Sequence, residues 1–185
     1  MRGIETQLKA VRERMKLLLA AHGSEISTSP HLAAEGELLL EQGAIAKTVL
    51  LLHEGSVAIE LQRSQGTPHT LAIVKAEEIL GEMGLFGNGV HSADVRVIGG
   101  SARLTVIDGN QLLQAMLFDS DLSMEILALI CQRCLQSNQL MGLLLDGIAA
   151  AHIGDRDQLK TSCDLLRTNS HSLAEAADRL SSLHP

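Results

Sequence analysis

The chain has 185 residues, which suits one domain with helical additions, and a formal net charge of −7. Its 15 lysines and arginines are scattered, which argues against a nucleic-acid-backbone binder because such proteins need a clustered positive face. Three cysteines without a secretory signal fit the reducing cytoplasm, and no apolar run could cross a bilayer, so we expect a cytoplasmic protein with neither DNA nor membrane as partner.

Residues 1–30 are predicted to form an N-terminal amphipathic helix and a linker. Apolar residues recur at steps of four and three along 4–22, which gathers them on one helical stripe. The stripe consists of Ile4, Leu8, Val11, Met15 and Leu18. Gly23, Ser24 and Pro30 then end the helix. The stripe favours packing on the helix's own domain, and a role in dimerisation stays open.

From Glu35 onward the apolar period shortens to two or becomes short continuous runs, which is typical of strands. The candidate strands are 38–40, 48–52, 57–61, 71–74, 95–98 and 104–107. His53-Glu54-Gly55-Ser56 predicts a tight hairpin turn, and Gly99-Gly100 predicts a second turn. Short strands with glycine turns favour a small barrel or a double-sheet roll, and a cupin is one alternative of that kind.

Residues 81–93 place four glycines (81, 84, 87 and 89) among polar side chains. Backbone without a Cβ can approach a ligand closely, and successive N–H groups in such a loop can hold an anion. Glu82 offers an acceptor at one end and Ser92 a hydroxyl at the other, which is what a sugar phosphate needs. Spacing alone does not separate this arrangement from a glycine-rich surface loop without a ligand.

The order Gly-Glu-Met-Gly-Leu-Phe, a glycine-containing loop and His-Ser-Ala resembles the phosphate-binding cassette of the cyclic nucleotide-binding domain family. That family includes bacterial catabolite activators and regulatory subunits of cAMP-dependent kinase, and the similarity extends from Gly36 to Asn138. It implies an α+β fold with an antiparallel double-sheet β-roll of about eight strands over residues 31–120. An N-terminal helix precedes the roll, and a long dimerisation helix and an extra C-terminal helix follow it.

The resemblance implies no cofactor but a cyclic nucleotide ligand such as cAMP. The residues that it assigns to this ligand are Gly81, Glu82, Met83, Gly84, Leu85, His91, Ser92, Ala93 and Asn138. The family pattern has arginine where this chain has His91. Because histidine is mostly neutral at pH 7 and arginine makes a charged, forked contact, the departure predicts weak cAMP binding that strengthens toward about pH 6. Arg96 and Arg103 are candidates for a replacement cation.

After Asp108 the period is helical again, first in a short helix and then in a long one that begins near Asp119. Residues 121–151 are predicted to be the dimerisation helix of a coiled coil, with a homodimer formed through 123–148. Its seam alternates steps of three and four through Leu127, Ile130, Cys134, Ser137, Met141, Leu144 and Ile148. A core helix of the same domain would give part of this stripe. Ser137 or Asn138 either sets the register of the pair or, as the resemblance implies, reaches the base of the nucleotide.

Residues 152–185 are predicted to form one amphipathic helix, straight or bent, that packs in a dimer or meets a protein partner. Its apolar series is Leu159, Cys163, Leu166, Leu173, Ala177 and Leu180. Catabolite activators carry a winged helix-turn-helix at this place, whereas this segment has neither a strand pair for a wing nor a basic recognition helix. A partly disordered tail is the alternative.

Catalytic and metal-binding patterns are missing from the sequence. The eight histidines form neither His-x-His nor His-Glu-x-x-His, and no nucleophile turn is present, so we expect no enzyme and no metal site. Cys131-x-x-Cys134 would need a second pair to hold zinc, and free thiols acting as small apolar residues are the simpler account.

The sequence therefore predicts a non-catalytic regulatory module in signal transduction. It would sense a cyclic nucleotide or a related phosphate weakly and relay binding through a helical dimer. The alternative is an interaction or scaffold protein that keeps the β-roll and has lost the ligand.

Overall fold

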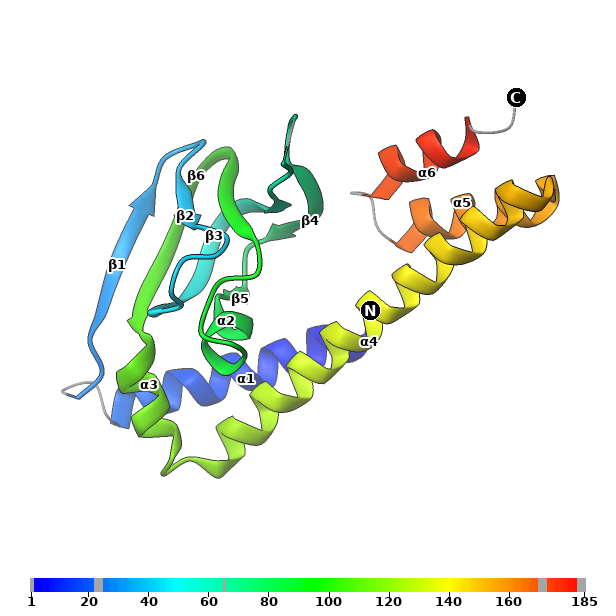
Figure 1. The fold of residues 1–185 in the computed structure, drawn as a ribbon. Helices are drawn as coiled ribbons and strands as arrows, with labels where there is room; N and C mark the ends of the chain where they lie inside the picture. Colours follow the sequence, from blue (N-terminus) through cyan, green and yellow to red (C-terminus); the bar gives the residue numbers. More distant parts are fainter. Residues whose placement is uncertain (1, 22–24, 65, 170–172, 183–185) are drawn as a thin grey trace.

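The computed structural model of the chain describes residues 2–21, 25–64, 66–169 and 173–182. A β-roll lies at one end of the molecule, and a bundle of helices lies at the other (Figure 1). The strands are β1 (Thr28–Ala33), β2 (Leu38–Leu40), β3 (Thr48–Leu61), β4 (His69–Lys75), β5 (Glu78–Leu80) and β6 (Asp94–Asp108). The helices are α1 (Arg2–Ala21), α2 (Glu82–Phe86), α3 (Gly109–Met116), α4 (Ser120–Ile153), α5 (Arg156–Asn169) and α6 (Ala174–Ser181).

The strands form one antiparallel assembly, which confirms the predicted roll with flanking helices. The described strands follow the order β1-β6-β3-β4, with β2 pairing to β6 and β5 pairing to β3. Strands β3 and β6 have 14 and 15 residues and pair with each other from Thr48↔Asp108 to Glu60↔Asp94. Each of these two long strands contains two of the short strands predicted from the sequence.

The predicted hairpin at residues 53–56 is wrong, because β3 continues through it. Gly55 has φ 95° and lies within the second of two register shifts in the β3–β6 pairing, so it forms a bulge that bends the strand without reversing it. A Cβ on Gly55 would lie 2.7 Å from the carbonyl oxygen of Ser101, which leaves room for glycine alone. The second predicted turn, at Gly99-Gly100, is likewise a positive-φ irregularity within β6 and not a reversal.

Strand β1 was not among the predicted strands. It pairs with residues 102–107 of β6. The signal was hidden because Ala33 is the one buried residue of the strand and Leu32 is 72% exposed, so no apolar alternation is visible. Pro30 lies within it, which an edge strand tolerates since one row of its backbone groups needs no partner.

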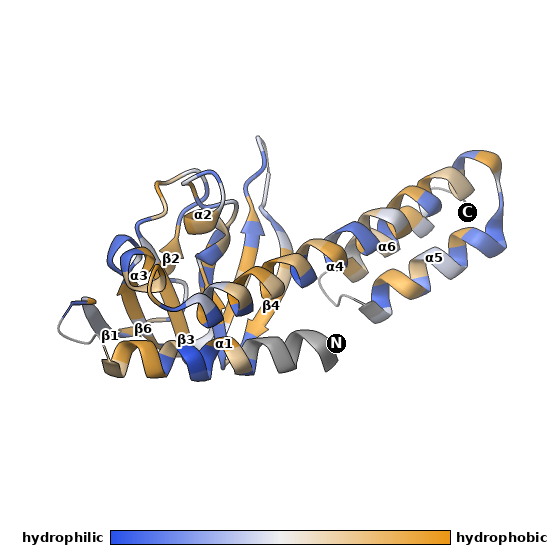
Figure 2. Cartoon of the chain, turned by 90° about the horizontal axis from the view of Figure 1, so that it is seen from below, coloured by the Kyte–Doolittle hydropathy of each residue, from blue (hydrophilic) through white to orange (hydrophobic). Residues whose placement is uncertain are grey.

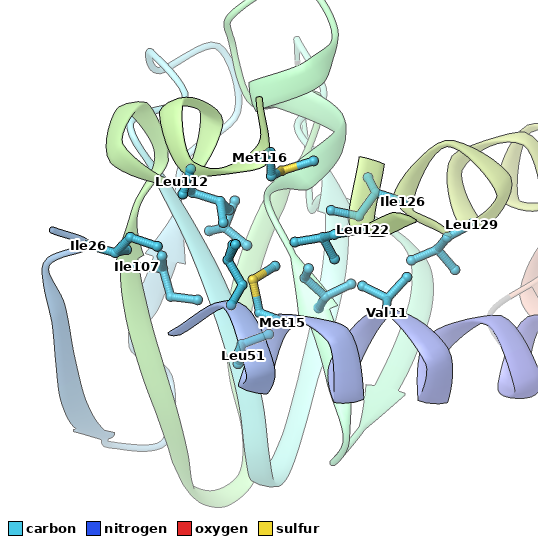
Figure 3. Packing of buried hydrophobic residues seen from close by; sticks show 14 residues of the cluster. Val11, Met15, Ile26, Leu51, Ile107, Leu112, Met116, Leu122, Ile126 and Leu129 are labelled. Carbon is cyan, nitrogen blue, oxygen red and sulfur yellow. The ribbon is translucent and has the colours of Figure 1, made fainter. Parts of the chain in front are cut away.

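Two hydrophobic clusters lie on opposite faces of the long strands. Val49 and Leu51 pack with the helices, whereas Leu50 and Leu52 point into the roll, so the continuous apolar run of β3 reflects burial on both faces. In the first cluster, Val11 and Met15 of α1 meet Leu122 and Ile126 of α4 (Figure 3). This contact supports the expectation that the first helix packs on its own domain. The side chains of Ile4 and Leu8 and the residues Gly23 and Ser24 lie outside the described part.

The long helix begins at its predicted place, where the Asp119 carboxylate accepts a hydrogen bond from the N–H of Leu122 (2.9 Å). Its predicted seam is shifted by one position in part, because Ile130 packs on the core next to α1 and Leu144 packs on α5 and α6. The stripe that stays exposed advances in steps of three and four and is apolar apart from one asparagine. It consists of Met124, Leu127, Cys131, Cys134, Asn138, Met141, Leu145 and Ile148.

The C-terminal segment contains two helices, so the prediction of a single helix is wrong. Gly154 ends α4 with φ 75°, α5 folds back along α4, and α6 reverses direction again to lie beside α5 (Figure 1). Most of the predicted apolar series forms the hydrophobic core of this bundle. Its buried members pack with Ala150 and Ala151 of α4, and they are Leu159, Cys163, Leu166, Ala177 and Leu180. The interruption predicted at Ser170 lies outside the described residues. No helix in the described ranges combines the length and apolar character that spanning a bilayer would take.

Candidate functional site

A cavity of about 290 Å³ lies between α2, the inner wall of the roll and the middle of α4. Its wall is mostly apolar, and its polar groups come from Glu78 of β5, from residues 82–92 and from α4. The roll contributes Leu40, Ile59, Ala72, Val74, Glu78, Leu80 and Val95, and α4 contributes Arg133 and Gln136. A concave apolar site with a few converging polar groups is typical of small-molecule binding.

Seven of the nine residues assigned to a ligand line this cavity. They are Gly81, Glu82, Met83, Gly84, His91, Ser92 and Ala93. The structure therefore brings the two ends of the cassette together, with the Glu82 carboxylate and the exposed Ser92 on one site. Leu85 instead packs against the first core cluster. Asn138 lies on the exposed stripe of α4, outside the cavity.

Gly81 and Gly84 of the cassette are needed for close packing. Gly81 has φ 88°, and a Cβ there would lie 2.9 Å from the carbonyl oxygen of Thr48. A Cβ on Gly84 would lie 2.8 Å from the carbonyl oxygen of Val90 and 3.1 Å from Nδ1 of His91. The turn around α2 therefore folds tightly onto the strand entry that carries His91 and Ser92, and this contact shapes one wall of the cavity.

Arg133 is the cation at this site, and the sequence analysis missed it together with Glu78 and Gln136. Its guanidinium binds the carboxylates of Glu82 and Glu78, the latter at 2.6 Å, and donates to the carbonyl oxygen of Ile79 at 3.2 Å. Glu82 is 1% exposed, so this is a buried ion pair between the cassette and α4. A signal existed in the sequence, since Arg133 is the one charged residue between Glu125 and Asp146.

Charge at the cavity is set by this cluster. Burial raises the pKa of Glu78, and the neighbouring Glu82 adds to the rise, while Arg133 opposes it. Within the described lining, Arg133 is the one permanent cation, and both of its carboxylate partners come from the roll. An anionic ligand would therefore meet a cation that already has partners.

His91 occupies the position of the family arginine but is nearly buried, with 6% of its surface exposed. Burial lowers its pKa, so the ring is neutral at pH 7 and the predicted strengthening of binding moves to more acidic conditions. The two replacement cations lie elsewhere. Arg96 binds Glu60 and the carbonyl oxygen of Gly36, and Arg103 binds Glu54.

Two other histidines, His53 and His69, lie away from the cavity. His53 contacts the Thr105 hydroxyl at 2.8 Å, and His69 is exposed at the start of β4. Within a single chain, the described residues contain no group of three or more His, Cys, Asp or Glu side chains placed to hold a metal ion. The arrangement is suited to binding and to coupling the ligand site with α4.

Comparisons with known proteins agree with this architecture. Residues 31–118 match the model of the cyclic nucleotide-binding domain family. No curated protein matches the sequence significantly.

Solved structures share the fold at low identity. The catabolite activator protein of Thermus thermophilus is 19% identical, with a TM-score of 0.63 over 91% of this chain and 80% of that one. The sensor domain of the transcriptional regulator DNR from Pseudomonas aeruginosa is 18% identical, with a TM-score of 0.57 over 70% of this chain and 93% of that one. A cyclic nucleotide-binding domain from Methylobacillus flagellatus is 22% identical, with a TM-score of 0.50 over 62% and 63% of the two chains.

Proposed function

We propose that this chain is a non-catalytic regulatory module that senses a cyclic nucleotide or a related phosphate, because residues 31–118 match the model of the cyclic nucleotide-binding domain family. The observation that carries the proposal is the buried ion pair between Glu82 of the cassette and Arg133 of α4, inside the cavity. It joins the residue suited to accept a ribose hydroxyl to the helix that leaves the roll.

The ion pair suggests how binding is passed on. A ligand whose hydroxyl donates a hydrogen bond to Glu82 competes with Arg133 for that carboxylate. The phosphate of the same ligand offers Arg133 a new anionic partner. Charged hydrogen bonds of this kind contribute about 1.5–3 kcal/mol each, so their exchange is large enough to change the position of α4. His91 adds no charge to this exchange at neutral pH, because burial lowers its pKa. We therefore expect weak binding.

The relay would run through a homodimer formed along the exposed stripe of α4. The stripe spans residues 124–148 and repeats every seven residues in two sets, 124-131-138-145 and 127-134-141-148. These are the a and d positions of a parallel coiled coil, and Asn138 then occupies an a position, where a single asparagine specifies a paired register. Figure 2 shows hydrophobic residues along the length of α4. Leu127, Met141, Leu145 and Ile148 are each more than half exposed in the single chain.

A scaffold protein without a ligand is the second candidate. It is favoured by the same cluster, since Arg133 already has two carboxylate partners and the family arginine is replaced by a neutral ring. In this case the ion pair would be a fixed brace between the roll and α4.

A thermal-shift screen separates the two candidates. The full chain is heated with cAMP, cGMP or a cyclic dinucleotide, and a ligand that binds the folded state raises the melting temperature by mass action. We expect a rise with at least one of these ligands and its loss in Glu82→Gln. Glu54→Gln is the control, because Glu54 pairs with Arg103 outside the cavity. An unchanged melting temperature with every ligand at millimolar concentration would contradict the sensor and favour the scaffold protein.

A further inference from the structure

Two of the three cysteines lie on the proposed dimer surface, one helical turn apart. Cys131 and Cys134 are exposed in the single chain, although most cysteines without a disulfide are buried as small apolar residues. The third, Cys163, is fully buried between α4, α5 and α6, as that rule expects. The sequence analysis treated the pair as small apolar residues, and in the single chain both are exposed on the stripe that would form the dimer seam.

The exposed stripe assigns Cys131 to an a position and Cys134 to the following d position. They are consecutive core layers of the proposed pair, between Leu127 and Asn138. In a parallel pair with a two-fold axis, each layer contains the same residue from both chains. The partner copy therefore supplies the second Cys-x-x-Cys that a four-thiolate site requires.

The geometry of such layers matches a tetrahedral site. Side chains at a and d positions lie on opposite sides of the plane through the two helix axes, and their layers are about 4.5 Å apart along the axis. The two-fold operation then sets the four sulfurs at alternate corners of a box, which are the vertices of a tetrahedron. Zinc bound to four thiolates at about 2.3 Å requires sulfurs about 3.8 Å apart and the two sulfur layers about 2.7 Å apart, so the Cβ–Sγ bonds of the two layers must lean toward each other along the axis.

We propose that Cys131 and Cys134 of two copies of this chain together bind one thiophilic divalent cation, with Zn²⁺ as the natural occupant. The inference rests on the proposed dimer, and the site is incomplete without the partner. A single chain offers two ligands, which agrees with the lack of a metal-binding group among its described residues. Asn138 in the next layer can donate its amide N–H groups to a thiolate and so support the ligands. The metal would fasten the middle of the α4 pair.

The test uses the full chain, purified with a thiol reductant and freed of metal by a chelator. Light scattering first establishes the oligomeric state. Zn²⁺ is then added, excess metal is removed, and bound metal is measured by elemental analysis. We expect about 0.5 Zn²⁺ per chain, and Co²⁺ in its place should give the intense visible absorption of a tetrahedral thiolate complex.

Substitutions assign the ligands. Cys131→Ser and Cys134→Ser should each lower bound zinc at least tenfold, because both positions are exposed in the single chain and the substitution does not disturb its core. Cys163→Ala is the matched control and should retain the full amount. Far-ultraviolet circular dichroism checks that each variant is folded.

The outcomes separate this inference from the proposal on which it rests. A monomeric chain would refute both the dimer and the shared metal site. A dimer that binds no zinc, or that keeps its zinc in the two serine variants, would overturn the metal site and leave the dimer. Iron with inorganic sulfide at these cysteines would overturn the assignment to a single bound cation.

Discussion

At the residue scale, the buried pair of Glu82 and Arg133 gives a prediction on stability. Arg133→Met leaves the Glu82 carboxylate, 1% exposed, without its cationic partner. Removing one member of a buried pair is costly because the other stays desolvated, and we expect a loss of about 2–4 kcal/mol in the free energy of unfolding. Urea denaturation measures it.

Arg12→Met is the control for this substitution. Arg12 pairs with Glu77, whose side chain is 71% exposed, so its loss should cost at most about 1 kcal/mol. Equal effects of the two substitutions would contradict the assignment of Glu82–Arg133 as a buried brace. A Glu82→Gln/Arg133→Met double variant should recover part of the loss, because it removes the unpaired charge.

Glu78 gives a prediction of pH dependence. Burial raises the pKa of Glu78 above its usual 4.5, so the unfolded chain releases this proton before the folded one does. Stability attributable to Glu78 therefore falls as pH rises from about 4.5 through the raised folded pKa, and then stays constant. Relative to wild type, Glu78→Gln should become more stable across that window. Urea unfolding of both proteins between about pH 4 and pH 8 measures the difference.

The neighbouring Glu77 supplies the control of opposite sign. Its hydrogen bond with Arg12 lowers the pKa of this carboxyl, so its contribution is present above pH 4.5 and is lost as the solution becomes more acidic. Glu77→Gln should therefore lose stability relative to wild type as pH rises. Parallel slopes for the two variants would show that burial at Glu78 is not the cause.

How much of the site the sequence predicts depends on how far apart its residues lie in the chain. Gly81, Glu82 and Ser92 belong to one local segment, and their pattern suffices to place them together. Arg133 reaches the site from a helix about 50 positions later, and no local pattern records which face of that helix meets the roll. The same reason explains Asn138, which was assigned to the ligand but lies outside the cavity. Its spacing along α4 does not show whether it faces the cavity or lies on the exposed stripe.

At the element scale, glycines in long strands decide the difference between the predicted and observed sheet. Gly55 and Gly99-Gly100 interrupt the apolar pattern of the sequence. A turn and a bulge both need a residue with positive φ, so glycine alone does not tell one from the other. Strand β3 continues through Gly55 because it pairs with β6, and this contact joins segments that are distant in the sequence. The starts of the helices were predicted more accurately, because Asp108 and Asp119 are local caps of the helices that follow them.

Gly55→Ala tests the bulge. The new Cβ would lie 2.7 Å from the carbonyl oxygen of Ser101, and the alanine would have to adopt φ 95°. We therefore expect a loss of about 3 kcal/mol or more in the free energy of unfolding. Gly43→Ala is the matched control, since Gly43 has φ 82° but nothing within 4 Å of its Cβ position. It should bear the backbone cost alone, about 1–2 kcal/mol. Thermal or urea unfolding of both variants compares the two losses, and equal losses would argue against close packing at the bulge.

At the scale of the whole molecule, the exposed stripe on α4 predicts a homodimer. Leu145→Glu puts a charge at an a position that is 59% exposed in the single chain, and we expect it to shift the chain to a monomer in light scattering. Leu32→Glu, on β1 and 72% exposed, is the control and should remain dimeric. A Leu145→Glu dimer as tight as wild type would place the contact on another surface.

The bundle beyond the roll shows what the sequence could not supply at this scale. The apolar series of residues 159–180 predicts an amphipathic segment, but periodicity does not say whether its partner is another chain or the same one. Packing of α5 and α6 on α4 satisfies that series within the chain. The same packing draws Leu144 into the bundle and leaves the neighbouring stripe of α4 exposed.

The unbroken length of α4 has a mechanical consequence. The helix has 34 residues, and about 21 Å of it separates Arg133, at the cavity, from Gly147, which Leu180 of α6 covers. A rod of that stiffness cannot absorb a rotation at one end, so a tilt of about 5° at the cavity would displace its far end by about 2 Å. Small rearrangements beneath the cassette would thereby be amplified where α5 and α6 lie, and a break in α4 between the two points would uncouple them.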